Sequence, residues 1–379
     1  MEAVAVVLVL SMFAPVTDPR AANARHRLVE ILAIALLATL CGEDDYPGIV
    51  EFGRDRHDWL KQFMELPHGI PSISTFRHIF AKVDPVELGE VLRCWAEELV
   101  KSCQGKQIAI DGKALRRSFE RAWKKLGLHM VTAWCVEENV VLAQRAVEEK
   151  SNEITAVPEL LKVLDFKGAV VTVDALNTQK TIAEQIIKGQ GDYVMAVKDN
   201  HPTLCDCIRR NLDEMILEKF KDVEHTADDS TEGGHGRIDR RRVWATGQLD
   251  WLEQKEQWAG LQSAVVVEAT RKTLKGQSTE RRYYISSLPP DAAELGRLIR
   301  NHWGIENGQH WCLDMGFRED ESRVRADHGD KNLAALRRIA INLLKRDKSV
   351  KLGIKNKRHK AGRNLDYLLG IITGTSNAK

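Results

Sequence analysis

The spacing of apolar positions divides the chain into a helical first part and a mixed α/β remainder. Apolar residues crowd positions 28–36 densely enough for a mostly buried helix. A Ser/Thr-rich start before Phe76, Ile79 and Phe80 predicts another helix. We therefore expect a helical N-terminal domain at residues 1–104. Its two short helices around Pro71 could form a DNA-reading helix-turn-helix or could simply pack as a helix pair.

Branched apolar runs typical of strands follow this helical part. Three such runs occupy residues 106–113, 128–136 and 139–147, and the "EEN" between the last two suits a hairpin turn. A helix, a buried strand, a second helix and a further strand then follow, so the predicted order is β-β-β-α-β-α-β. Strands interleaved with helices in this way predict an α/β fold, a mixed sheet with helices on its faces.

The remaining pattern predicts an insertion and a helical end. A charged helix and a ribbon of antiparallel strands interrupt the mixed sheet, and helices return afterwards. The expected parts are 105–200 as the first part of a core, 201–288 as an inserted helix plus mainly β ribbon, 289–347 as the last core helices, and 348–379 as a basic C-terminal tail.

Composition restricts the class of protein without identifying a partner. The 379 residues are enough for two or three domains, and the formal charge of +2 with a pI near 8.1 is too balanced to establish a polyanion partner. Seven cysteines without repeated spacing fit reduced thiols better than a disulfide framework. Cys205 and Cys207 could suggest zinc, but the sequence offers no second ligand pair.

Two apolar runs raise the question of a membrane segment. The run at the N-terminus follows Glu2 and has no preceding Lys or Arg, unlike a secretory leader. The run at 31–41 is shorter than the roughly 20 residues that span a bilayer. We expect both to be buried segments of a cytoplasmic protein that has no membrane partner.

Two aspartates end buried strands of the expected sheet. Asp111 stands in "IAIDGK" and Asp174 in "VVTVDAL", and ligands gather at the ends of buried strands in open α/β sheets. Each aspartate alone is as well explained as a turn former or helix cap. Together they would repel each other unless a cation lies between them. Glu153 could extend this acidic site, but a favourable interaction with the start of the following helix is the preferred interpretation. Asn177 could orient a ligand or cap the following helix.

A third carboxylate lies far downstream in "IRNHWGIENGQHW". His302 and His310 stand four residues either side of Glu306, so a regular helix would place all three on one face. A lone helical glutamate is usually solvated, but Trp303 and Trp311 would make an unpaired carboxylate costly. Divalent ions supply the missing compensation, since Mg²⁺ prefers carboxylate, water and phosphate oxygens. The two tryptophans favour core packing, with stacking on a nucleic-acid base as the alternative.

Several segments together resemble the DDE transposases of bacterial insertion sequences, in the branch that includes the H-repeat-associated proteins. They are "IAIDGKALRRS", "VVTVDALNTQKTIAEQI", "GDYVMAVKDNHPTL", "RYYISSL" and "IRNHWGIENGQHWCLDMGFREDESRVR". The segment "DPR…RHRLVEILAIALLATLCG" is similar to that branch's associated N-terminal domain. The resemblance implies a ribonuclease-H-like catalytic core interrupted by a mainly β insertion. Asp111, Asp174 and Glu306 match the family's catalytic and metal-binding carboxylates.

The resemblance also implies the reaction and the partners. The reaction would be metal-dependent phosphodiester cleavage at the ends of an insertion sequence, followed by strand transfer. The metal would be Mg²⁺, with Mn²⁺ as an alternative. The partner would be double-stranded DNA with terminal inverted repeats, bound by a homodimer in the cytoplasm and associated with the nucleoid when acting. A catalytically silent DNA-binding relative and a metal-dependent nuclease without a mobile element remain the alternatives.

Candidate DNA contacts come from basic residues and histidines near the carboxylates. Related enzymes carry tyrosine, arginine and lysine around the glutamate, where this chain has Ile299, His302 and Leu313. The side chains that could hold DNA phosphates instead are Lys113, Arg116, Arg117, Arg300, His302, His310 and Arg318. The basic stretches 235–242 and 355–363 are further candidates, or solvated charged faces.

Overall fold

Helices form the whole chain before the first strand. The computed structural model describes residues 2–115, 128–147, 153–234 and 236–374. The first helices are α1 Glu2–Phe13, α2 Leu28–Leu40, α3 Tyr46–Asp55, α4 His57–Leu60, α5 Ile73–Lys82 and α6 Pro85–Leu99. Three of them begin at a polar cap whose side chain accepts a backbone N–H, namely Asp45, Ser72 and Asp84. These caps explain why the helices start where they do.

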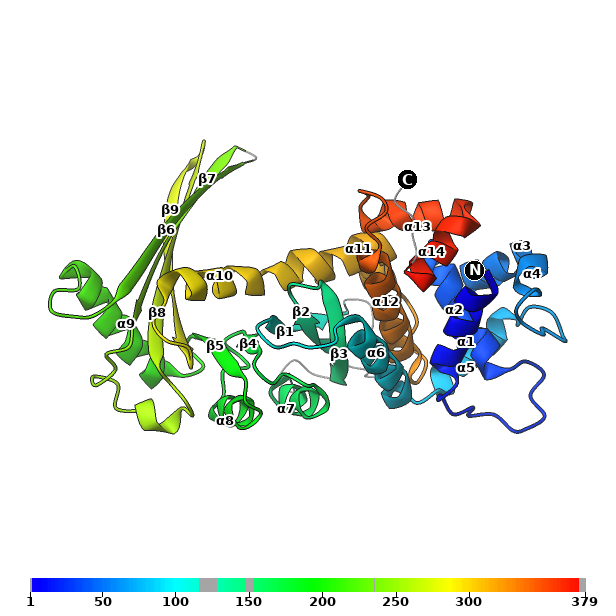
Figure 1. The fold of residues 1–379 in the computed structure, drawn as a ribbon, viewed down its shortest axis with the longest axis horizontal. Coiled ribbons are helices and arrows are strands. Elements are labelled where there is room, and N and C mark those ends of the chain that lie inside the picture. The colour runs from blue at the N-terminus through cyan, green and yellow to red at the C-terminus, as the bar shows by residue number, and fades with distance from the viewer. Residues whose placement is uncertain (1, 116–127, 148–152, 235, 375–379) are drawn as a thin grey trace.

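A sheet of nine strands runs from the middle of the molecule to one end (Figure 1). Its strands are β1 Gln107–Ala114, β2 His129–Cys135, β3 Val140–Val147, β4 Val170–Val173, β5 Asp192–Val197, β6 Thr226–Gly234, β7 Arg237–Thr246, β8 Ser263–Thr273 and β9 Gly276–Ser286. Their spatial order is β3-β2-β1-β4-β5-β9-β8-β7-β6. Strands β1, β4 and β5 are parallel, and the other pairings are antiparallel. The predicted order β-β-β-α-β-α-β and the mixed sheet are confirmed.

Helices cover both faces of the parallel strands. Helices α7 Glu153–Val163 and α8 Lys180–Lys188 pack on one face, and α10 Ala292–His302 crosses the other (Figure 1). Successive residues of β1 alternate between these faces, as in any strand. Ile108 and Ile110 join the core on the α7 and α8 side, whereas Ala109 joins the opposite core. Asp111 therefore projects toward the side of α10.

The predicted insertion continues the sheet instead of forming a separate layer. It contains α9 Pro202–Leu217 and strands β6 to β9, and β9 pairs directly with β5 through Val194 and Ser286. The paired strands β6 to β9 extend well beyond the sheet as a long ribbon (Figure 1). Their outer halves carry arginines that pair with acidic residues of neighbouring strands, such as Arg240 with Asp229.

The two ends of the chain share one hydrophobic core. After the sheet come α11 Trp311–Phe317, α12 Gly329–Arg346, α13 Ile354–Arg363 and α14 Leu365–Thr373. Helix α14 lies against α1, and α12 packs against α2, α5 and α6. Residues 348–374, expected as a basic tail, thus contain two helices, and Leu368 and Ile371 are buried. The N-terminal helices complete their core only with these C-terminal ones.

Two N-terminal expectations have different outcomes. Residues 61–72 separate α4 from α5, and this connection is far longer than the turn of three or four residues in a helix-turn-helix. The interpretation of the helices around Pro71 as a helix-turn-helix is therefore wrong. The N-terminal apolar run forms α1, which packs against α2 and α14. Val9 and Phe13 of this helix are buried and Val7 is 56% exposed, so the expected burial is confirmed only in part. Within the described residues, no helix combines the length and apolar character needed to cross a bilayer.

Two cations of the basic stretch 355–363 are buried and bind carbonyl oxygens near the C-terminal ends of other helices. Arg358 donates to the carbonyl oxygens of Thr39 and Gly316 near the ends of α2 and α11, and it pairs with Asp44 at 2.7 Å. Lys357 donates to the Leu344 carbonyl at 2.8 Å near the end of α12. Cations stabilise helix C-termini because the last carbonyls there lack intrahelical partners. These two cations are therefore not available to DNA.

Replacing Arg358 with methionine tests this role. The variant Arg358→Met leaves several buried acceptors without donors, so we expect the free energy of unfolding to fall by about 3 kcal/mol. Urea denaturation followed by circular dichroism measures it. Lys355→Met, an exposed change on the same helix, is the matched control. Equal stabilities for the two variants would contradict the capping role.

Candidate active site

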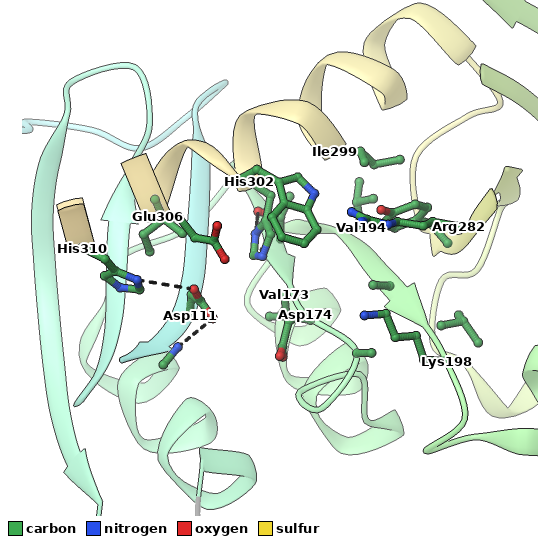
Figure 2. A pocket seen from close by; sticks show the side chains of 18 of the residues that line it. Asp111, Val173, Asp174, Val194, Lys198, Arg282, Ile299, His302, Glu306 and His310 are labelled. Atoms are coloured by element: carbon green, nitrogen blue, oxygen red, sulfur yellow. Dashed lines mark hydrogen bonds and ion pairs between the residues drawn. The ribbon is translucent and has the colours of Figure 1, made fainter. Parts of the chain in front are cut away.

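Strand register places two carboxylates side by side. In the parallel pair β1 and β4, Ile110 lies opposite Val173, so Asp111 and Asp174 follow at neighbouring positions. Adjacent strands are roughly 5 Å apart. Both aspartates line one cavity of about 820 Å³ at the carboxyl end of these strands (Figure 2). The pairing of two strand ends therefore brings together residues that are far apart in sequence.

Glu306 reaches the same cavity from the helix that crosses the sheet. Gln107 Nε2 donates to the Leu298 carbonyl at 2.8 Å and to Thr172 Oγ1 at 3.0 Å, and Thr172 Oγ1 lies 2.9 Å from His302 Nδ1. These contacts fix the end of α10 over β1 and β4. Glu306 lies beyond the end of α10 and lines the cavity with the aspartates. Figure 2 shows its carboxylate turned toward Asp111.

The regular helix expected around Glu306 is wrong. Helix α10 ends at His302, and Glu306–His310 forms a π-helical turn before α11. Such turns occur mostly at functional sites. Lys345 on α12 donates to the Gly308 carbonyl within this turn and to Asn139 Oδ1 at 2.5 Å. Burial lowers the pKa of Lys345 to about 8, so its ammonium group still holds the turn at neutral pH.

Among the described residues, no lysine or arginine lies within ion-pair distance of Asp111, Asp174 or Glu306. Burial, and then the charge of Asp174, raise the pKa of Asp111 to about 7, with Glu153 and Glu306 adding to the effect. Asn177 donates to Asp174 Oδ1 from its backbone at 3.1 Å and from its side chain at 2.9 Å. Oxygen ligands with surplus negative charge suit a hard divalent cation. Among the described residues, however, no three His, Cys, Asp or Glu side chains are already gathered closely enough to hold a metal ion.

Glu153 belongs to the surroundings of this site. Its side chain is buried at the start of α7, and a Cβ atom on Gly112 would lie only 2.5 Å from its carboxyl carbon. Glycine at position 112 is therefore what allows Glu153 to approach the strand end beside Asp111. This position favours extension of the acidic site over capping alone.

The two histidines near Glu306 are neutral at physiological pH. Burial is the main reason that the pKa values of His302 and His310 fall to about 4. His302 binds Thr172, and His310 Nδ1 lies 3.8 Å from Asp111 Oδ2. Neutral imidazoles offer a phosphate a hydrogen bond but no ion pair. Their position speaks against the predicted phosphate contacts and favours roles in holding the site together.

Lys113 is a structural cation. Its ammonium group is buried and lies 2.7 Å from Asp314, 3.1 Å from Asp320 and 3.4 Å from Glu319. Glu319 in turn pairs with the fully buried Arg338 of α12 at 2.8 Å. Three acidic partners and burial speak against the predicted contact of Lys113 with DNA phosphates. The network instead ties β1 to the segment that follows α11.

The other predicted DNA contacts have separate outcomes. Arg300 pairs with Glu232 of the ribbon, and Arg318 pairs with Glu321, both at exposed positions where a phosphate can replace the carboxylate. Contacts of these two arginines with DNA stay predictions. Arg116 and Arg117 lie outside the described residues.

Sequence analysis missed two cations and misjudged the tryptophans. Lys198 follows β5 just as Asp174 follows β4, so the strand-end rule could have found it. The expectation that Asp111 ends its strand is wrong, because β1 continues to Ala114. Arg282 on β9 lies over the Trp303 ring at 4.7 Å, and both residues line the cavity. Figure 2 shows Arg282 near Lys198, on the side of the cavity away from Glu306. Trp303 is 39% exposed and Trp311 59% exposed, so the preference for core packing is wrong. No local sequence signal distinguishes these positions from a core helix.

Comparison with known families agrees with this geometry. The model of the transposase DDE domain matches residues 103–343, and the model of the domain associated with it matches residues 10–96. The chain belongs to the DDE transposase family.

This DDE transposase is similar to proteins over most of its length. YncI of Escherichia coli O157:H7, described as a candidate transposase, is 34% identical over 93% of this chain and 90% of its own length. YhhI of Escherichia coli K12, described as an H-repeat-associated candidate transposase, is 34% identical over 92% of this chain and 93% of its own. An uncharacterised protein of Xanthobacter autotrophicus is 41% identical over 74% of this chain and 94% of its own.

The raised pKa of Asp111 predicts how the stability of the metal-free transposase depends on pH. Between about pH 4 and pH 7 the unfolded chain has lost this proton and the folded chain keeps it, so stability falls as pH rises toward 7. Asp111→Asn removes the effect. We expect the free energy of unfolding of this variant, relative to that of the wild type, to increase across that interval and to level off above it. The upper limit of the difference is about 4 kcal/mol.

Urea denaturation in EDTA at several pH values measures this difference. Asp192→Asn, a change in a carboxylate on β5 that does not line the cavity, serves as the control. A difference between Asp111→Asn and the wild type that stays constant with pH would refute the raised pKa.

Proposed function

We propose that this transposase cuts and rejoins DNA at the ends of an insertion sequence, with Asp111, Asp174 and Glu306 as catalytic carboxylates that hold divalent metal ions. The observation that carries the proposal is that three carboxylates from distant segments line a single cavity in a chain of this family. Mg²⁺ is the proposed metal, with Mn²⁺ as an alternative, because the ligands are hard oxygens.

The strand order supports a ribonuclease-H-like catalytic core. The five strands β3-β2-β1-β4-β5 combine an antiparallel hairpin edge with three parallel strands, and the π-helical turn after α10 supplies the third carboxylate. We propose that residues 105–200 and 289–347 make up this core and that residues 201–288 interrupt it. In this arrangement residues 2–104 and 348–374 form one helical module beside the core.

The bound metal ions and the side chains in and around the cavity have distinct proposed tasks. Bound metal ions would activate the attacking oxygen and stabilise the leaving one during phosphodiester displacement. Asn177 orients the Asp174 carboxylate, and Lys345 holds the turn that carries Glu306. Lys198 and Arg282 offer positive charge to the DNA backbone at the other end of the cavity.

The substrate we propose is double-stranded DNA with terminal inverted repeats, bound by a homodimer during transposition and recombination. The protein would act in the cytoplasm at the nucleoid. Family membership supports the DNA substrate. The cations of the cavity support a contact with its phosphates.

A cleavage assay on the DNA that flanks the coding region tests the proposed reaction. With Mg²⁺ we expect strand cuts at the inverted repeats and joined products, and EDTA abolishes both. Asp111→Asn, Asp174→Asn and Glu306→Gln should each lower the cleavage rate by about 10³-fold or more, because loss of a metal ligand removes several kcal/mol of transition-state stabilisation.

The alternatives give different results in the same assay. Gel-shift binding by the Asp111→Asn variant shows that a loss of cutting is not a loss of folding. Binding by the wild type without any cutting would indicate a catalytically silent relative. Cutting that ignores the repeats would indicate a general nuclease, and either result contradicts the proposal.

A separate prediction concerns Lys198. If it contacts a DNA phosphate, Lys198→Ala weakens DNA binding and lowers the slope of log affinity against log salt concentration by about 1. Fluorescence anisotropy with a labelled duplex in EDTA measures both quantities. Lys188→Ala on α8, which removes an exposed cation from the helix-covered face of the sheet, should change neither. Equal behaviour of the two variants would place Lys198 outside the DNA path.

A further inference from the structure

A second basic surface lies on the helical module, away from the carboxylates. It combines the exposed face of α5 with the loop 322–326, and we call it the α5 surface. Arg77 of α5 lines a cavity of about 690 Å³ together with Arg323 and Arg325. The next residue, His78, lines a cavity of about 570 Å³ together with Arg25. The two hollows therefore flank the same helix.

The acidic residues around the α5 surface are already engaged. Those near the loop have the following partners: Asp44 pairs with Arg358, Asp45 caps α3, Glu321 pairs with Arg318, and Asp327 pairs with Lys82. In the part of the chain that the structure describes, Arg25, Arg77 and Arg323 have no carboxylate within ion-pair distance, and all three are exposed. These three guanidinium groups are therefore open to an anionic partner.

Packing holds the loop against α5. The backbone N–H of His328 donates to the Ala81 carbonyl at 3.2 Å, and Lys82 pairs with Asp327 at 3.2 Å. A Cβ atom on Gly329 would lie 2.8 Å from Val324, which shows how closely the chain folds back here. The arginines of the loop and Arg77 of α5 therefore form one fixed array.

The α5 surface also lies close to the proposed active site. Arg323 follows three residues after Asp320, which lines the cavity with Asp111. Three residues span at most about 11 Å. Asp320 itself is fixed to β1 through Lys113 at 3.1 Å. The loop end of the α5 surface therefore lies within about 11 Å of a residue that lines the cavity.

We propose that the α5 surface binds the phosphate backbone of duplex DNA next to the segment that enters the active cavity. The inference rests on the proposed function, because it assigns the surface that holds the substrate. Arginines with unused donors match the dense charge of a duplex, one phosphate per about 1.7 Å of helix axis. A protein partner would call for an apolar or aromatic centre. Ile73, 39% exposed, is the one large apolar side chain exposed on α5 among the described residues.

Salt-dependent binding tests the α5 surface without any need for cleavage. The probe is a fluorescein-labelled duplex of random sequence, about two helical turns long, titrated with full-length protein in EDTA at several salt concentrations. Arg77→Ala and Arg323→Ala should each raise Kd several-fold and lower the salt slope by about 1, and the double variant by about 2. Lys162→Ala, which removes an exposed cation on α7, is the charge-matched control and should change neither.

The outcomes separate this inference from the proposed reaction. Arg77→Lys and Arg323→Lys keep the charge and should keep most of the binding, which rules out a folding defect as the cause of a loss. Alanine variants that match the control in Kd and slope would overturn the α5 surface, whether or not the wild type cuts DNA. Unchanged DNA binding with altered sedimentation would make it a protein contact and would overturn the inference equally. A wild type that binds through these arginines but never cuts would refute only the reaction.

Discussion

Repulsion between carboxylates at the ends of two neighbouring parallel strands is the constraint on which the site depends. Register fixes Asp111 beside Asp174, and burial prevents water from screening their charges. The folded chain lowers this cost by holding a proton on Asp111 near neutral pH. A cation that replaces the proton would be favoured for the same electrostatic reason. The surrounding structure keeps the aspartates together despite their repulsion.

The surrounding structure is held by buried cations. They bind residues around the three carboxylates and not the carboxylates themselves. Lys113 and Arg338 hold the acidic segment after α11 against β1, and Lys345 holds the π-helical turn that carries Glu306. Each of these side chains is buried and bound to at least one of the partners named. They fix the geometry of the third carboxylate without neutralising the first two. Mobile and exposed cations, such as Lys198, lie where a phosphate backbone could reach them.

The helical module shows why basic clusters are poor guides to DNA contacts by themselves. Arg358 and Lys357 belong to a strongly basic stretch, yet both are buried as caps for the ends of other helices. Arg77 and Arg323 do not belong to a strongly basic stretch and lie far apart in the sequence, yet both line one cavity in the folded chain. The buried caps differ from the exposed arginines in whether their hydrogen-bond donors already have partners. The number of basic residues nearby in the sequence does not distinguish them.

The sequence by itself determined the order of the strands, the two strand-end aspartates and the family. Alternation of apolar residues and strand-end position depend on neighbours within a few residues, so a local pattern is enough to reveal them. Only the tertiary structure decided that Lys113 is structural, that the helix around Glu306 is broken by a π turn, and that the C-terminal stretch completes the N-terminal core. Each of these depends on contacts between segments hundreds of residues apart. Burial and ion pairing across such distances leave no periodic trace in the sequence.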